Sequence, residues 1–344
     1  MRLGLIPQNL LEALALWLKR VPTPAGEVIF AMMLSRAIMA GVRLGVFDAL
    51  EGERLTVGEL AGRIRCDRYG VEALVEALRS SGYLVRQGDR LSNAPPASRW
   101  LVSASPHYLG NLVQFNYDHW GWWSQLEERV ARGEAVGIHH RPHSEEELRR
   151  YVLAMRDLAR SCADEVAAAL PIPRGARRLL DLGGSHGVYS AALCRRHPGL
   201  SATVLDLEPI TRIGRQLAAR DGLPERVSYR AADITTDPLG EGFDVALLFQ
   251  LLHHFPPRKA RLLLRRVAES LEPSGLVALL EPADEGGSRQ LAGLLSLHYY
   301  LASGGSVHGR SRLEAWLAEA GFHRMAATRL HSAPGLELLT ARWR

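Results

Sequence analysis

The regular alternation of apolar strands and amphipathic helices after Arg178 constrains the fold of this chain more than any other feature. Leu179-Leu180-Asp181-Leu182 is typical of a buried strand. Further strands are expected at 203–207, 227–230, 243–248 and 276–281, with helices at 188–196, 210–220 and 258–271 between them. This order predicts an α/β fold, a Rossmann-like doubly wound and mainly parallel sheet. Right-handed crossovers place the carboxyl ends of such strands at one edge, where ligands bind.

A glycine-rich loop, Gly183-Gly184-Ser185-His186-Gly187, follows the first expected strand. Glycine lets the backbone approach a ligand that a Cβ atom would exclude. Asp206 ends the second expected strand, where a carboxylate can accept hydrogen bonds from both hydroxyls of a ribose. Together the loop and the acid predict a nucleoside-containing cofactor. The alternative is a tight strand-to-helix turn that binds no ligand.

The spacing within the loop narrows the choice of cofactor. The dinucleotide pattern GxGxxG would require glycines where the chain has Ser185 and Val188, or His186 and Tyr189. A phosphate-binding loop of the GxxxxGK[ST] type is excluded because no lysine lies nearby. The remaining pattern, D-x-G-x-x-x-G from Asp181, suits S-adenosylmethionine (SAM), whose amino-acid end carries no phosphate.

The N-terminal third predicts a winged helix. Thr56 and Glu59 form the pattern of a capping box at the start of one helix, and Asp67 is a typical N-cap for the next. A strand–turn–strand pattern at 83–92 follows. Before these, apolar residues at helical spacing within 8–45 predict helices that pack on a partner subunit, so we expect a homodimer.

A winged helix also raises the hypothesis of DNA binding, in which its second helix enters the major groove. The exposed face of that helix carries Glu72 and Glu76 besides Arg68 and Arg79, and two carboxylates would face phosphates unfavourably. A structural or dimerisation role is therefore favoured over a nucleic-acid partner.

Composition excludes several other classes. With 47% hydrophobic residues, 23% charged residues and a net charge of +5, the chain does not have the composition of a disordered protein. No uninterrupted apolar run reaches the roughly 18–20 residues that span a bilayer, so no membrane partner is expected. Cys66, Cys162 and Cys194 lie too far apart for a metal cluster or a disulfide framework. We expect a cytoplasmic protein without a metal.

The stretch 115–123 concentrates five of the chain's Phe, Trp and Tyr residues in nine positions. Packing in the core is one interpretation. The other is a pocket wall for a flat or apolar substrate, to which Phe115 and Trp122 would contribute. His298, within the apolar segment 291–301, is a further candidate for that wall.

In their order and spacing these motifs resemble the class I SAM-dependent methyltransferases of the plant caffeate O-methyltransferase and bacterial polyketide or hydroxyindole O-methyltransferase type. The resemblance spans most of the chain, from the winged helix onward. It is carried by Asp181-Leu182-Gly183-Gly184 with Gly187, Leu205-Asp206-Leu207, Asp233-Ile234, Leu252-His253 and Ala320-Gly321-Phe322. It implies a winged-helix dimerisation domain at 1–100, a helical segment at 101–174 that contributes to the substrate pocket, and a SAM-binding catalytic domain at 175–344.

The resemblance also implies roles for individual residues. Asp181, Gly183, Gly184 and Gly187 would lie at the methionine part of SAM, Asp206 at the ribose, and Leu207, Asp233 and Ile234 around the adenine. Phe249 falls where many relatives have a lysine near the cofactor. Met155 matches a methionine that packs near the substrate in relatives.

His253 matches the general base of the family, and Glu281 matches the first of two acidic residues that flank it. Around the second, the chain reads Ser306-Val307-His308-Gly309-Arg310 and contains no acid. Methyl transfer to a hydroxyl needs a base as the proton leaves, and histidine suits that role at neutral pH. The favoured function is methyl transfer from SAM to a hydroxyl of a small aromatic or apolar metabolite. Transfer to carbon or nitrogen, a SAM-dependent reaction without methyl transfer, and a winged-helix regulator remain alternatives.

Overall fold

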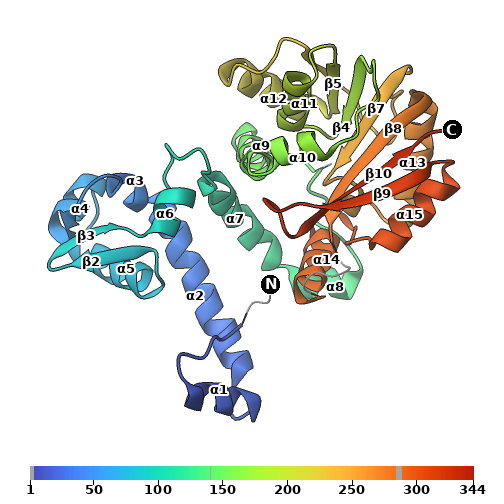
Figure 1. Cartoon of the computed structure of the whole chain (residues 1–344). Helices are drawn as coiled ribbons and strands as arrows, with labels where there is room; N and C mark the ends of the chain where they lie inside the picture. The colour runs from blue at the N-terminus through green and yellow to red at the C-terminus, as the bar shows by residue number, and fades with distance from the viewer. Residues whose placement is uncertain (1–3, 140, 284–288) are drawn as a thin grey trace. The chain divides into compact units, whose positions relative to one another are not determined.

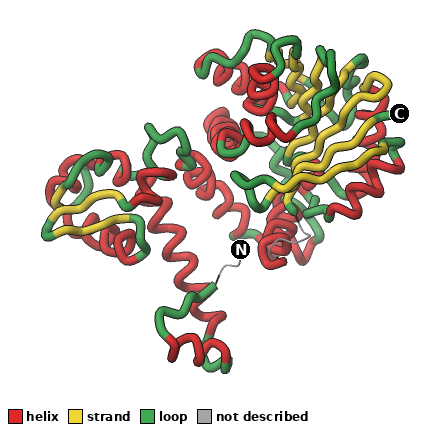
Figure 2. Tube along the Cα trace, in the orientation of Figure 1, coloured by secondary structure: helices red, strands yellow, loops and turns green. Residues whose placement is uncertain are grey.

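The computed structural model describes residues 4–139, 141–283 and 289–344. These residues divide between Tyr117 and Asp118 into two compact units. Each unit has its own hydrophobic core, and each is described here by itself (Figures 1 and 2).

The N-terminal unit contains the predicted winged helix. Its elements are α1 (Leu10–Trp17), α2 (Thr23–Arg43), α3 (Val46–Ala49), β1 (Leu55–Thr56), α4 (Val57–Ile64), α5 (Arg68–Ser80), β2 (Leu84–Gln87), β3 (Arg90–Asn93), α6 (Pro95–Trp100) and the start of α7 (Gly110–Trp123). The three strands form a small sheet in the order β1-β3-β2. The two-residue strand β1 was not predicted, because so short a run has no alternation to detect.

Local capping explains why the helices of the winged helix begin where they do. The Thr56 hydroxyl accepts from the Glu59 N–H while the Glu59 carboxylate accepts from the Thr56 N–H, which confirms the capping box. The Asp67 carboxylate accepts from the Gly70 N–H, so α5 has the predicted N-cap. The apolar faces of both helices then close over one core, with Leu60 and Val75 fully buried.

Helices α1 and α2 expose much of their apolar surface. Leu10 is 89%, Trp17 77% and Val28 72% exposed. No uninterrupted apolar run of 18 residues is present, since Arg36 interrupts α2, but an 18-residue window of this 21-residue helix has a mean hydropathy of 1.5. By length and composition alone, α2 is therefore apolar enough to cross a bilayer. Length and composition alone do not distinguish a membrane span from an apolar face that packs on protein.

The C-terminal unit contains the large sheet. Its helices are the end of α7, α8 (Leu126–Arg132), α9 (Glu145–Arg160), α10 (Ala163–Ala169), α11 (Val188–Arg196), α12 (Glu208–Arg220), the 3₁₀ turn η1 (Leu252–His254), α13 (Pro257–Ser270), α14 (Arg289–Ser303) and α15 (Arg310–Glu319). Its strands are β4 (Arg178–Leu182), β5 (Ser201–Asp206), β6 (Val227–Ala231), β7 (Phe243–Phe249), β8 (Leu271–Pro282), β9 (His323–Arg329) and β10 (Leu336–Arg342).

The seven strands lie in the order β6-β5-β4-β7-β8-β10-β9. The pairs from β6 to β8 are parallel, and β10 runs antiparallel to both of its neighbours. The prediction of a doubly wound, mainly parallel sheet is therefore confirmed, and β9 and β10 are additions to it. The chain builds outward from β4 to β6 and then returns to β7, so the order reverses between β4 and β7. A ligand crevice is expected at the carboxyl ends of these two strands.

Helices cover both faces of the sheet (Figure 1). One core cluster joins α13 and α15 to one face, and includes Leu264 and Trp316. The other joins α10 and α11 to the opposite face, and includes Val166 and Leu193. Because β4, β7 and β8 are buried on both faces, they are nearly continuous apolar runs, as in other parallel sheets.

Candidate active site

The glycine loop after β4 is held tightly by backbone hydrogen bonds. The Gly183 N–H donates to Leu205 O at 2.7 Å, and the Gly187 N–H donates to Gly184 O at 2.8 Å. Gly183 and Gly187 have φ angles of +66° and +67°, which favour glycine. A Cβ atom on Gly183 would lie 2.9 Å from the Leu251 side chain, so the loop closely approaches the turn that follows β7.

Two buried carboxylates lie at this end of the sheet. Asp181 is 1% exposed and accepts from the Ser190 hydroxyl at 2.6 Å, and burial raises its pKa to about 7. A Cβ on Gly184 would lie within 2.7 Å of the Asp181 carboxyl oxygens, so only glycine leaves room for that carboxyl group. Asp206 accepts from the N–H groups of Ser185 and Leu207, and burial raises its pKa to about 6.

The turn η1 after β7 presents His253 beside Glu281 of β8. The His253 Nδ1 lies 2.6 Å from one Glu281 oxygen, and the side chains are 3% and 5% exposed. The other oxygen accepts from the N–H groups of Leu251 and Leu252 at 2.9 and 2.7 Å. Glu281 therefore fixes both the turn and the orientation of the imidazole. A neutral His253 that donates from Nδ1 has its lone pair on Nε2.

Aromatic rings surround His253. The Tyr299 ring of α14 stacks on it, with centroids 3.8 Å apart, and the His254 ring lies at 4.4 Å. His298, the residue before Tyr299 in α14, stacks on Trp122 and Trp123 of α7. The Trp123 Nε1–H donates to His298 Nδ1 at 3.3 Å. Burial, and next the charge of His253, lowers the pKa of His298 to about 4, so this ring is neutral at neutral pH.

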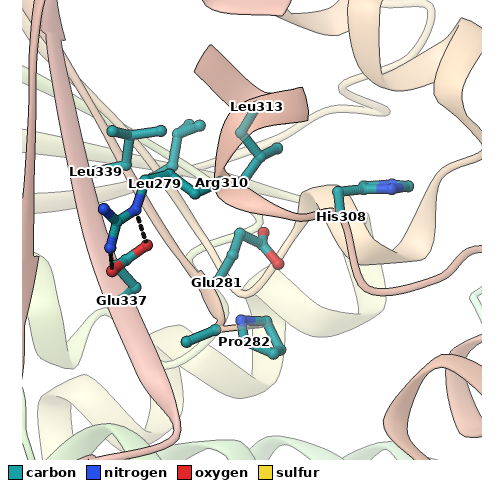
Figure 3. A pocket seen from close by; sticks show the side chains of 9 residues that line it. Leu279, Glu281, Pro282, His308, Arg310, Leu313, Glu337 and Leu339 are labelled. Atoms are coloured by element: carbon teal, nitrogen blue, oxygen red, sulfur yellow. Dashed lines mark hydrogen bonds and ion pairs between the residues drawn. The ribbon is translucent and has the colours of Figure 1, made fainter. Parts of the chain in front are cut away.

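Glu281 also lines a small pocket, together with residues of β10 and α15 (Figure 3). Arg310 and Glu337 face each other in it as an ion pair, with Arg310 Nε donating to a Glu337 oxygen at 2.7 Å. Glu337 on β10 is directly opposite Glu281 on β8 in the antiparallel register. The segment 306–310 contains no acid, but β10 brings a carboxylate to the same pocket, where Arg310 neutralises it.

His308 also lines this pocket and forms a hydrogen bond to the chain directly after the turn η1. It is 3% exposed, and its Nε2 bonds to the carbonyl oxygen of Phe255, the residue after the turn. Sequence reasoning named this position only as the place of a missing acid.

The loop and Asp206 fit a nucleoside-containing cofactor. The glycines at 183, 184 and 187 leave backbone that a ligand can approach closely, and the Asp206 carboxylate retains acceptor capacity beside its two N–H partners. The carboxyl ends of β4 and β7 thus carry a loop suited to a cofactor and a histidine held by a carboxylate.

Comparison with known proteins shows the family to which the chain belongs. A family model described as "O-methyltransferase domain" matches residues 123–323, and one described as "O-methyltransferase dimerisation domain" matches residues 27–104. The chain belongs to the O-methyltransferase family. It is thereby a SAM-dependent enzyme with a dimerisation domain, and the exposed apolar surface of α2 is consistent with that domain.

Individual relatives are distant but similar over nearly their whole length. The chain is 28% identical to the 3-hydroxy-5-methyl-1-naphthoate 3-O-methyltransferase of Streptomyces sahachiroi, covering 91% of this chain and 93% of the relative. It is also 28% identical to the N,N-dimethyltransferase OxyT of Streptomyces rimosus, covering 89% of this chain and 92% of the relative. The crystal structure of human N-acetylserotonin methyltransferase in complex with SAM has the same fold, with a TM-score of 0.83, 23% identity, and coverage of 92% and 96%.

Within this O-methyltransferase, the predicted site residues fall into two groups. Those assigned to the methionine and ribose ends of SAM lie together at the carboxyl ends of β4 and β5, with Leu207, assigned to the adenine, directly after β5: Asp181, Gly183, Gly184, Gly187 and Asp206. Those assigned to catalysis and acceptor binding meet around His253: Glu281, His298 and, through His298, Trp122.

Other predicted residues have different surroundings. Asp233 accepts from the N–H and hydroxyl of Thr235, and Ile234 is 8% exposed. Phe249 packs edge to face on Tyr189 in the core, with ring centroids 4.9 Å apart. Met155 is half-buried on α9. Phe115 is buried in the N-terminal unit, and its contact with a substrate remains a prediction from the sequence.

The structure adds residues that no motif indicated. Tyr151 of α9 packs against the same core cluster as Leu207, and burial, followed by the charge of Asp206, raises its pKa. Gly214 of α12 lets that helix approach the loop, since a Cβ there would lie 2.1 Å from the Ser185 carbonyl oxygen. Gln250, with φ of +50°, follows β7 and helps to turn the chain toward η1. Only a positive φ or a close approach in three dimensions identifies such residues.

Proposed function

We propose that this enzyme transfers the methyl group of SAM to a hydroxyl group of a small aromatic or apolar metabolite, with His253 as the general base. The observation that carries the proposal is the Glu281–His253 pair at the crevice between β4 and β7. When bound, SAM supplies a methyl group already activated by its positively charged sulfur.

The residues of the chain then have three tasks. Asp206 accepts hydrogen bonds from the ribose, and the loop 183–187 holds the amino-acid end. The packed rings orient the acceptor, and orientation alone can lower the barrier by up to about 7–11 kcal/mol. His253 Nε2 accepts the hydroxyl proton while Glu281 stabilises the imidazolium that forms. The cofactor contacts proposed for Asp233 and Ile234 complete the adenine side, and Phe249 is proposed to lie near the cofactor at the end of β7.

The rings support an aromatic or apolar acceptor. Trp122, Trp123 and His298 present stacked, uncharged surfaces close to His253, and flat molecules gain most from such walls. Met155 is proposed to add a flexible apolar contact from α9.

Transfer to nitrogen is the second candidate, favoured by the similarity to an N,N-dimethyltransferase. A neutral amine attacks without first losing a proton, so it needs a base less than a hydroxyl does. Because a hydroxyl acceptor needs a base, the Glu281–His253 pair is better explained by a hydroxyl acceptor than by an amine.

The test is product analysis. The purified enzyme is incubated with methyl-labelled SAM and metabolite extracts, and labelled products are identified by mass spectrometry and NMR. A methyl group on oxygen supports the proposal, and one on nitrogen or carbon contradicts it.

The proposal includes a homodimer formed through the N-terminal unit, a cytoplasmic location, and neither nucleic acid nor a membrane as partner. Sedimentation of the purified protein, with and without lipid vesicles or duplex DNA, tests these points together. A dimer that stays free of both ligands is the expected result, and co-sedimentation with either would contradict it.

A further inference from the structure

Ser185, in the middle of the glycine loop, has two features that a glycine would avoid. Its φ angle is +44°, in the left-handed region that disfavours a residue with a Cβ. Its side chain is buried at 5% exposure, and its hydroxyl oxygen has no hydrogen-bond partner among the described residues. Both features destabilise the ligand-free protein.

The backbone of Ser185 cannot easily move to relieve either feature. Its N–H donates to Asp206 Oδ2 at 3.1 Å. Its carbonyl oxygen lies against Gly214 of α12, closely enough that even a Cβ on Gly214 would not fit. The next residue is held as well, because the Tyr229 hydroxyl donates to His186 O. The serine is therefore fixed beside the carboxylate that is proposed to bind the ribose.

We propose that the Ser185 hydroxyl is a cofactor-binding group, which forms a hydrogen bond to a ribose hydroxyl of bound SAM next to Asp206. Ser185 Oγ and the Asp206 carboxylate then form one polar edge for the sugar, joined by the Ser185 N–H. The unsatisfied hydroxyl of the ligand-free protein is satisfied only in the complex. This adds a residue to the cofactor site that neither the glycine pattern nor the ribose-binding acid indicated.

The experiment compares Ser185→Ala and Ser185→Gly with the native full-length protein in two measurements. Isothermal titration gives the Kd of the demethylated product, S-adenosylhomocysteine, and of adenosine, which lacks the amino-acid end. Thermal unfolding without ligand gives the Tm. Alanine removes only the hydroxyl, whereas glycine also relieves the left-handed backbone.

We expect both variants to bind S-adenosylhomocysteine and adenosine more weakly, by about three- to tenfold, as for the loss of one hydrogen bond. We expect the ligand-free Tm to be unchanged or higher for Ser185→Ala, and higher by about 2 °C or more for Ser185→Gly. Weaker binding together with an equal or higher Tm distinguishes a ligand-directed hydroxyl from a structural one.

Ser270→Ala is the matched control. Ser270 is 2% exposed, and its hydroxyl donates to Val267 O within the protein. This variant should lower the Tm and leave both Kd values unchanged. If Ser185→Ala behaves like Ser270→Ala, the proposal is wrong. An effect on S-adenosylhomocysteine without one on adenosine would also overturn it, because the hydroxyl would then contact the amino-acid end.

Discussion

The two sides of the active-site crevice are built in different ways. On the β4–β5 side, backbone hydrogen bonds hold a short loop, and the Asp206 carboxylate accepts from the N–H of Ser185 in this loop and from the N–H of Leu207. On the β7–β8 side, the groups that fix His253 are side chains from separate elements: Glu281 from β8 and Tyr299 from α14. The first side depends on backbone groups of two adjacent parallel strands and the loop after β4, and the second on side chains that pack together from separate elements.

This difference predicts how the two sides respond to change. Substitutions on the β4–β5 side should alter cofactor affinity and leave the chemical step nearly intact. Substitutions on the β7–β8 side should alter turnover or acceptor binding and leave cofactor affinity unchanged. Four experiments test this separation.

Replacing His253 with alanine should have the largest effect. Loss of the general base should lower kcat by about 10²- to 10⁴-fold, while the Kd of S-adenosylhomocysteine stays within about twofold. The acceptor identified by product analysis supplies the rate assay, and titration supplies the Kd. His331→Ala, at a side chain that is 99% exposed, is the control and should retain full activity. Unchanged turnover in the His253 variant would remove the base from the mechanism.

The substitution Asp206→Asn should have the second largest effect. The amide keeps the shape but loses the charge that strengthens hydrogen bonds to the ribose and to two N–H groups. We expect the Kd of S-adenosylhomocysteine to rise by about ten- to one-hundredfold, with kcat at saturating SAM within about threefold. Titration and initial rates measure the two quantities. A large fall in kcat at an unchanged Kd would contradict the proposed separation.

Trp123→Phe should have a moderate effect confined to the acceptor. It removes the Nε1–H that donates to His298 and keeps an aromatic ring in the wall. The KM of the acceptor should rise by about two- to tenfold, and the Kd of the cofactor should not change. Trp120→Phe on the same helix, at a side chain that is 40% exposed, is the matched control. Equal effects of the two variants would show that His298 is not oriented through Trp123.

The smallest effect concerns pH. Burial raises the pKa of Asp181 to about 7 and that of Asp206 to about 6, above the value near 4 of an unfolded aspartate. The folded, ligand-free state therefore binds protons more tightly, and the free energy of unfolding should fall as the pH rises from about 4 to about 7. Thermal unfolding of the native protein and of Asp181→Asn at pH 5 and pH 8 measures this contribution.

In that comparison, the native protein should lose more stability between pH 5 and pH 8 than Asp181→Asn does. Asp89→Asn, at an exposed position of the β2–β3 turn, should behave like the native protein. An Asp181 variant with the native pH dependence would show that this carboxyl group does not titrate in the range its burial implies.

Much of the β4–β5 side could be predicted from the sequence. The expected strands at 179–182 and 203–207 differ from β4 and β5 by at most two residues at either end, and α11 has the predicted bounds of 188–196. Glycines and an aspartate at fixed spacing specify a loop because they act on the backbone nearby. The predicted capping box at Thr56 is local in the same way.

Less of the β7–β8 side could be predicted from the sequence. The strands β9 and β10 were not predicted. The position of Glu337, which lies on β10 opposite Glu281 in the antiparallel pair, was therefore missed as well. The grouping of His254 with His139, at 4.4 Å between ring centroids, joins residues far apart in the chain that no spacing rule connects. Isolated histidines and tyrosines carry no local signal of which partners they will meet.

By itself, the sequence determined the order of strands and helices, the glycine loop and the acid at the end of the second strand, because hydrophobic periodicity and glycine spacing are patterns along the chain. The tertiary structure decided how Glu281 orients His253, which rings pack around His298, and that the Ser185 hydroxyl has no hydrogen-bond partner among the described residues. These properties depend on how the strand order, the helix α12 and the helix α14 bring distant residues within a few ångströms of each other.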